Sequence, residues 1–140
     1  MNRSQRKKEP IIFDQDEFIK PNTSAEILAQ LRPAFKKEGG SVTAGNASGL
    51  NDGAGALLIA SDQGLKEHNL KPMARIVSMG VAGVEPRIMG IGPVYASEKA
   101  LAKAGLTLAE MDIIELNEAF AAQACAVNKD MGWDPAIVNV

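Results

Sequence analysis

The chain has 140 residues, of which 46% are hydrophobic, and a formal net charge of −2 at pH 7. These values are typical of one globular domain, and the slightly acidic balance argues against a general nucleic-acid-binding role. We expect a cytoplasmic protein, because no apolar run reaches the roughly 20 residues of a membrane-spanning helix and the start MNRSQRKKEP lacks the apolar region of a secretory signal.

The first nine residues carry a basic cluster of Arg3, Arg6, Lys7 and Lys8, which Glu9 follows at once. No aromatic residue interleaves with the basic ones to stack on bases. The composition therefore favours a solvated loop over a nucleic-acid patch.

From residue 10 onward, predicted strands and helices alternate. Apolar runs predict strands at residues 10–13, 56–60, 74–79, 112–117 and 136–140. Start and stop signals predict helices after Ser24, from a capping Asp62 to about His68, from Pro93 to the stop at Gly105, and from Glu118 to the stop at Gly132. Residues 106–110 read as a turn or a short helix. This alternation is typical of an α/β layered fold in which helices cover a sheet.

The chain ends on AIVNV, which reads as a strand interrupted within a fold. We therefore expect the chain to be part of a longer protein. No internal linker or tandem repeat stands out, so residues 10–140 are treated as one structural unit or part of one.

A glycine-rich segment, TAGNASGLNDGAG, covers residues 43–55. It is neither a P-loop nor a dinucleotide fingerprint, because no Lys-Ser or Lys-Thr follows a G-x-x-x-x-G and no G-x-G-x-x-G opens a helix. Its glycines permit tight turns, and Ser48 with two asparagines offers polar groups to a ligand. The pattern fits an extended polar ligand as well as a plain structural turn.

The segment ELNEAF, residues 115–120, places Asn117 at the end of a predicted strand and the start of a predicted helix. Open α/β sheets bind ligands at this position, and helices place their N-cap there. Asn117 is therefore either a cap alone or a cap that is also a catalytic amide. Glu118, in the first helical turn, would favour the helix dipole in either case. The small Ala119, Ala121 and Ala122 would let another backbone or a ligand approach closely.

Cys125 is the only cysteine and His68 the only histidine. No histidine stands near Cys125 in the sequence, so a packed small side chain is favoured over a nucleophile. His68 lies among charged residues at a helix end and is expected to be exposed. One histidine and one distant cysteine support no metal site.

Three runs, VTAGNASGLNDGAGALLIAS, MGIGPVYASEKAL and NEAFAAQ, resemble the C-terminal part of a thiolase. They occur in family order, and the resemblance extends from about Gln5 to Val140. It implies a layered α-β-α-β-α fold, of which this chain is part of the C-terminal half. Residues 10–140 would then be an incomplete thiolase C-terminal domain, and residues 1–9 a basic loop or a remnant foreign to the family.

The resemblance also implies a chemistry, which is Claisen condensation or thiolysis of β-ketoacyl-CoA through an acyl-cysteine intermediate. Coenzyme A and acyl-CoA would be the substrates, with no further cofactor, and the full-length protein would be a homodimer or homotetramer. In the family, the asparagine matching Asn117 holds a water that donates into the oxyanion hole of the reacting thioester. The substrate-binding residues implied in the same way are Ser48, Ala119 and Phe120 at the pantetheine arm, Met89 in the acyl pocket, and Lys20 beside the adenine.

The chain departs from the family pattern at the other catalytic groups. It has no acylated cysteine, no Gly-His-Pro histidine and no second cysteine, and Cys125 matches neither cysteine motif. The isolated chain is therefore expected to be inactive and to need the remainder of a thiolase chain as its partner. The alternative is a naturally short, non-catalytic thiolase-like module that binds acyl-CoA or another protein.

Overall fold

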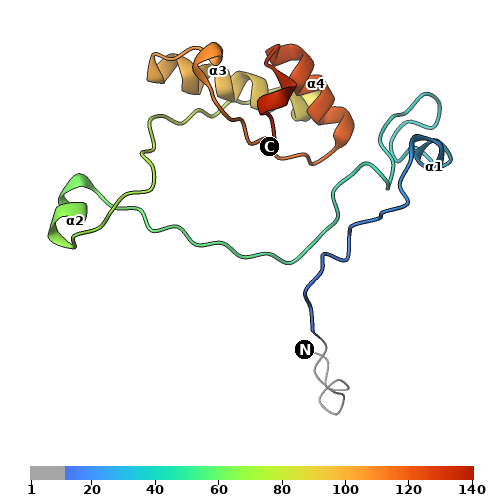
Figure 1. Cartoon of the computed structure of the whole chain (residues 1–140). Coiled ribbons are helices and arrows are strands. Elements are labelled where there is room, and N and C mark those ends of the chain that lie inside the picture. Colours follow the sequence, from blue (N-terminus) through green and yellow to red (C-terminus); the bar gives the residue numbers. More distant parts are fainter. Residues whose placement is uncertain (1–11) are drawn as a thin grey trace.

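The computed structural model describes residues 12–140. Its helices are α1 (Ala25–Ala29), α2 (Asp62–Glu67), α3 (Gly92–Ala104) and α4 (Ala121–Met131), joined by the 3-10 turns η2 (Pro86–Ile91), η3 (Leu108–Glu110) and η4 (Pro135–Ile137). Figure 1 shows α3 and α4 together near the C-terminus, whereas α2 stands apart on a long extended stretch of chain. None of these helices is long and apolar enough to cross a membrane.

Local signals set the ends of several helices as predicted. The Ser24 side chain accepts a hydrogen bond from the backbone N–H of Ile27 and so caps α1. Proline occupies the first turn of α3, and Gly105 ends that helix with a left-handed φ of 68°. Gly132 ends α4 in the same way, with a φ of 66°.

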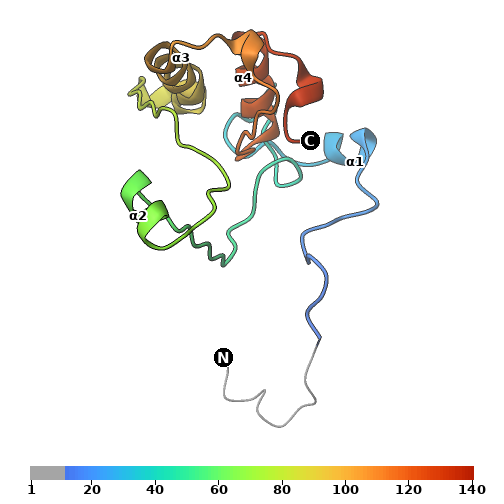
Figure 2. The same cartoon turned by 60° about the vertical axis from the view of Figure 1, so that its left-hand side comes forward.

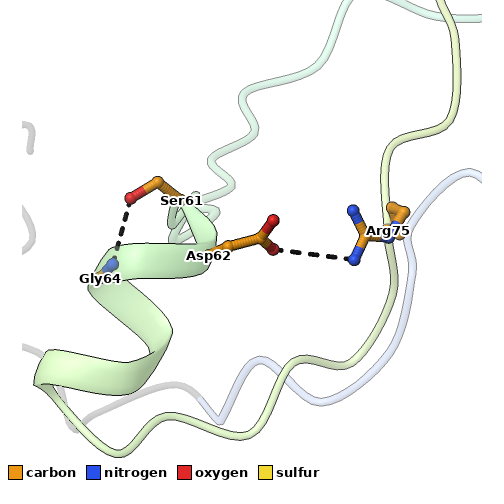
Figure 3. A network of polar contacts seen from close by, with 4 residues as sticks. All are labelled: Ser61, Asp62, Gly64 and Arg75. Atoms are coloured by element: carbon orange, nitrogen blue, oxygen red, sulfur yellow. Dashed lines mark hydrogen bonds and ion pairs between the residues drawn. The ribbon is translucent and has the colours of Figure 1, made fainter.

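Helix α2 confirms a predicted helix but corrects its cap. The Ser61 hydroxyl accepts a hydrogen bond of 3.1 Å from the Gly64 N–H, so Ser61 is the N-cap and Asp62 is the first helical residue (Figure 3). The prediction that Asp62 caps this helix was wrong by one position, because the serine hydroxyl already fills that role. Asp62 instead lies 3.7 Å from Arg75, and since both side chains are mostly exposed the pair contributes little stability.

The predicted strands do not form as strands. Within residues 12–140 the only β pairing is two isolated bridges, an antiparallel one between Ala47 and Phe120 and a parallel one between Ile114 and Val138. The strand predictions for residues 56–60 and 74–79 are therefore wrong. The strands predicted at 112–117 and 136–140 are present only as the single bridge between Ile114 and Val138. The predicted strand 10–13 lies partly outside the described residues, and residues 12 and 13 form no regular structure.

A missing neighbour explains this outcome, because a strand is defined by hydrogen bonds to an adjacent strand. Among residues 12–140, no strand pairs with residues 56–60 or 74–79 to supply these hydrogen bonds. The apolar side chains of both segments stay exposed, as Leu57 illustrates with 92% of its surface open to solvent. The sequence pattern for burial is present, but the surface that would bury it is not among the described residues.

The hydrophobic core lies between α3, α4 and η2. Val94 of α3, Val127 of α4 and Trp133 are its buried members, and Trp133 donates a hydrogen bond of 2.8 Å to the side chain of Asn128. Partly buried apolar residues surround them: Ile91, Leu108, Ile114, Leu116, Met131 and Val138. Each fully buried aliphatic side chain contributes about 1.5–3 kcal/mol, so this cluster holds η2 and α3 against α4.

Candidate functional site

The glycine-rich loop packs on the start of α4. The Ser48 N–H donates to the carbonyl of Ala119 and the Ala121 N–H donates to the carbonyl of Asn46, both at 2.9 Å. These bonds flank the bridge between Ala47 and Phe120, and Figure 2 shows the loop that follows α1 beside α4. The prediction that small residues here admit another backbone is confirmed for Ala119 and Ala121.

Asn46 shapes this loop, a role that the sequence reasoning missed. Its side-chain oxygen accepts a hydrogen bond of 2.7 Å from the Thr43 N–H, and its side-chain nitrogen donates to the Ser41 carbonyl at 2.8 Å. Thr43 is buried beneath the turn. An asparagine among glycines is a known signal for such a side-chain turn, so the sequence did contain the information.

Helix α4 begins later than predicted. Its N-cap is Phe120, which makes no side-chain cap bond and has extended backbone angles, and its first residue is Ala121. Asn117 is therefore not a cap and Glu118 is not in the first turn, so both predictions were wrong. The pairing with residues 46–48 keeps Phe120 extended and delays the helix. Capping no longer accounts for an amide at position 117.

Asn139 holds the backbone immediately before Asn117. Its side-chain oxygen accepts from the Leu116 N–H at 2.7 Å, and its side-chain nitrogen donates to the Leu116 carbonyl at 3.0 Å. The backbone of Asn139 is left-handed, with a φ of 54°, and its N–H donates to the Ile114 carbonyl at 2.8 Å. The sequence reasoning missed this contact, since nothing local to position 139 indicates it.

A cavity of about 260 Å³ opens between η2 and the start of α4. Asn117, Ala119, Phe120 and Met89, all predicted site residues, line it. The rest of the lining is Gly90, Pro93, Leu116 and Gln123. The structure thus brings together residues 89 and 117, which lie far apart in the sequence.

Two predicted site residues do not line this cavity. Ser48 lies beside it, because its N–H donates to the carbonyl of the lining residue Ala119. Lys20 is exposed in the segment before α1, where its carbonyl accepts from the Thr23 N–H at 3.1 Å. A second cavity, of about 340 Å³, lies by Tyr95 and Lys99 and contains none of the predicted site residues.

The lining is mostly apolar and carries no charged side chain. Asn117 and Gln123 supply its polar side chains, while the exposed Glu115 and Glu118 lie outside the lining. A neutral amide in the lining of an apolar cavity can donate a hydrogen bond to a carbonyl oxygen or a water without forming an ion pair. The edge-to-face contact between Phe35 and Phe120, with ring centres 6.1 Å apart, fixes one wall.

Cys125 and His68 take no part in this arrangement. Cys125 is a free, exposed thiol on α4, so the prediction that it packs as a small hydrophobic side chain was wrong. It lies on a different face of the helix from the buried Ala124 and Val127. His68 is exposed at the end of α2, as predicted. Among residues 12–140, no three histidine, cysteine, aspartate or glutamate side chains are grouped to hold a metal ion.

Comparison of the sequence with known families gives two matches. Residues 70–140 match the family described as "Thiolase, C-terminal domain", and residues 1–63 match "Thiolase, N-terminal domain". The boundary between the two matches falls within residues 64–69, at α2 and the turn after it.

Curated relatives are similar over nearly the whole chain. The acetyl-CoA acetyltransferase of Rhizobium meliloti is 58% identical over 134 residues, which are 96% of this chain and 34% of the relative. That of Allochromatium vinosum is 59% identical over 136 residues, which are 97% of this chain and 34% of the relative. The chain therefore spans about a third of the length of these relatives.

Solved structures of similar sequence superpose well on the chain. Human mitochondrial 3-ketoacyl-CoA thiolase in complex with CoA matches with a TM-score of 0.85 and 53% identity, over 91% of this chain and 32% of that structure. The acetyl-CoA acetyltransferase of Bacillus anthracis matches with a TM-score of 0.85 and 52% identity, over 92% of this chain and 32% of that structure.

Proposed function

The chain belongs to the thiolase family and has part of the thiolase fold, and from this premise we propose that it is a segment of a CoA-dependent acyltransferase. The reaction is Claisen condensation or thiolysis of β-ketoacyl-CoA through an acyl-cysteine. Acyl-CoA and coenzyme A are its substrates, and no further cofactor is required. The observation that carries the proposal is the position of Asn117 in the lining of the cavity, where capping does not explain its side chain.

Asn117 is the proposed catalytic residue. Its amide nitrogen holds a water that donates to the thioester oxygen as negative charge develops on it. A neutral donor stabilises an enolate oxygen without forming an ion pair with it. Such donors typically stabilise the transition state by about 3 kcal/mol. The flanking Glu115 and Glu118 have no part in this step, since both lie outside the cavity lining.

The substrate's acyl group and pantetheine arm occupy the cavity and its edge. Met89 forms the acyl wall, while Ala119 and Phe120 lie against the pantetheine arm. Ser48, on the loop bonded to Ala119, contacts the arm from the other side. The apolar lining supports this assignment, because such surfaces exclude water from a thioester and strengthen the remaining polar contacts.

The remainder of a thiolase chain is the proposed partner. This sequence contains no acylated cysteine, no Gly-His-Pro motif and no second catalytic cysteine, so the isolated chain should not turn over. The exposed apolar residues of segments 56–60 and 73–81 support the proposal, since they need a covering surface. The full-length protein is proposed to be a homo-oligomer, and one similar structure, from Saccharomyces cerevisiae, is described as a dimeric peroxisomal thiolase.

The test is acyl transfer by the intact gene product, measured as condensation of two acetyl-CoA molecules and as thiolysis of acetoacetyl-CoA by coenzyme A. Asn117→Ala should lower kcat by about two orders of magnitude with near-normal folding, as expected for one oxyanion donor. Asn22→Ala is the matched control, because Asn22 is exposed in a turn before α1 and does not line the cavity. An intact gene product that binds acyl-CoA but transfers no acyl group would instead identify a non-catalytic module.

A further inference from the structure

Gln123 of α4 contacts the backbone that carries Met89. Its side-chain nitrogen donates a hydrogen bond of 3.1 Å to the carbonyl of Gly90 in η2, across 33 residues of sequence. The two residues also pack closely, because a Cβ added to Gly90 would lie 2.7 Å from the Cγ of Gln123. Only glycine at position 90 permits this approach, so hydrogen bond and packing together join η2 to α4.

The other end of the same amide is left without a partner. The Oε1 of Gln123 is buried and makes no hydrogen bond within the described part of the chain. Leaving a buried acceptor unpaired costs stability, and turning the amide over would set its oxygen against the Gly90 carbonyl. An aliphatic side chain would remove the unpaired oxygen but also the donor to the Gly90 carbonyl, so the purpose of the amide is its contact with Gly90.

That purpose follows from where the contact lies. Met89 and Gly90 form one side of the 260 Å³ cavity, and Asn117 and Phe120 form another. Met89 is flexible and 69% exposed, so its own packing does not hold it in place. The bond to Gly90 fixes the backbone from which Met89 projects, and it does so from the helix that begins beside Phe120.

We propose that Gln123 is a positioning residue that sets the distance between Met89 and the start of α4, and thereby the size of acyl group that the cavity accepts. This inference rests on the proposed function, because it takes the cavity to be the acyl site. In this role Gln123 needs no contact with the reacting atoms. It acts through Met89.

The experiment measures acyl-group selectivity in the intact gene product. Gln123→Leu removes the donor at similar volume, and Gln123→Glu keeps the shape but presents a carboxylate that cannot donate. Both variants should raise the KM for acetyl-CoA about fivefold, the equivalent of one neutral hydrogen bond, while kcat changes less than twofold. The ratio of kcat/KM for hexanoyl-CoA over acetyl-CoA should rise. Gln63→Leu on the exposed face of α2 is the matched control and should change neither value.

Hydrogen–deuterium exchange gives a readout that does not depend on activity. The peptide covering residues 86–91 should exchange faster in both Gln123 variants, while the peptide covering α2 stays unchanged. If the parent protein transfers no acyl group but this exchange rises, the proposed function fails and the positioning contact stands. Unchanged exchange, or faster exchange with unchanged acyl selectivity in an active enzyme, would overturn the inference.

Discussion

The side chain of Asn139 binds both backbone groups of Leu116, the residue that precedes Asn117. The two bonds, of 2.7 and 3.0 Å, fix the Leu116 peptide groups in position and direction. Asn139 makes them from a left-handed backbone conformation, which asparagine tolerates better than most residues. The direction in which the chain enters position 117 is therefore set by Asn139, which lies 23 positions after Leu116 in the sequence.

This relationship predicts that Asn139 matters for turnover. In the intact protein, Asn139→Gly keeps access to the left-handed backbone but removes both bonds, and we expect kcat to fall about tenfold with a smaller change in KM. Asn139→Ala should show the same kinetic loss and an extra loss of about 1 kcal/mol in the free energy of unfolding, because alanine is strained at this φ. Steady-state kinetics and urea denaturation separate the two effects. Full activity of the glycine variant would show that the contact with Leu116 does not position Asn117.

A second prediction concerns the packing of residues 78–81 on α3. A Cβ on Gly80 would lie 2.2 Å from the carbonyl oxygen of Ala96, a backbone atom that cannot move aside easily. Gly80→Ala should therefore destabilise the protein by about 1–3 kcal/mol, as overpacking does elsewhere. It should also break the hydrogen bond of 2.7 Å from the Ser78 hydroxyl to the Ala100 carbonyl. Gly83→Ala is the control, since no atom lies within 4 Å of the added Cβ, and equal unfolding free energies for the two variants would contradict the packing.

The turn at the start of η3 predicts the direction in which the pKa of Glu110 is shifted. The backbone N–H and the hydroxyl of Thr107 both donate to the Glu110 carboxylate, at 2.7 and 2.8 Å, and they hold the pKa of that carboxyl below its ordinary value of 4.5. A lowered folded-state pKa means that these bonds stabilise the turn above pH 4.5 and are lost as the pH falls through the folded-state pKa. Thr107→Val removes one of the two donors and should move the pKa of Glu110 part of the way back. Carboxyl ¹³C NMR titration measures it, and an unchanged pKa would remove the hydroxyl as a cause.

A further prediction concerns Lys20, which lies outside the cavity lining. If it lies beside the adenine of coenzyme A, Lys20→Ala should raise the KM for CoA about threefold and leave kcat unchanged. Lys20→Arg should lower that KM, since a planar guanidinium stacks better on a flat ring. Equal KM values for all three proteins would separate Lys20 from the binding site.

The helix ends were largely predictable because their signals are local. Ser24 caps α1 through a residue three positions on, and Gly105 and Gly132 end their helices where they stand in the sequence. The strands were not predictable in the same way, since residues 56–60 have strand-like composition but no described neighbour to pair with. The composition indicates which residues a fold would bury, but whether those residues form a strand depends on a neighbouring strand with which to pair.

In the candidate site, too, some residues could be predicted from the sequence and the long-range contacts that hold them could not. The resemblance to thiolases brought out Asn117, Met89, Ala119 and Phe120, which the structure places around one cavity. It did not bring out the residues that hold them, because contacts such as Gln123 to Gly90 join side chains to backbone across long sequence separations. The start of α4 was misplaced for a related reason, as pairing with residues 46–48 keeps the chain extended to Phe120.

The position of the Asn117 amide in the complete protein with acyl-CoA bound is the most direct test of its proposed role. A crystal structure of that complex should show the side-chain nitrogen about 2.9 Å from a water that in turn lies within hydrogen-bond distance of the thioester oxygen. An amide turned away from the acyl group, with no water between them, would contradict the proposal.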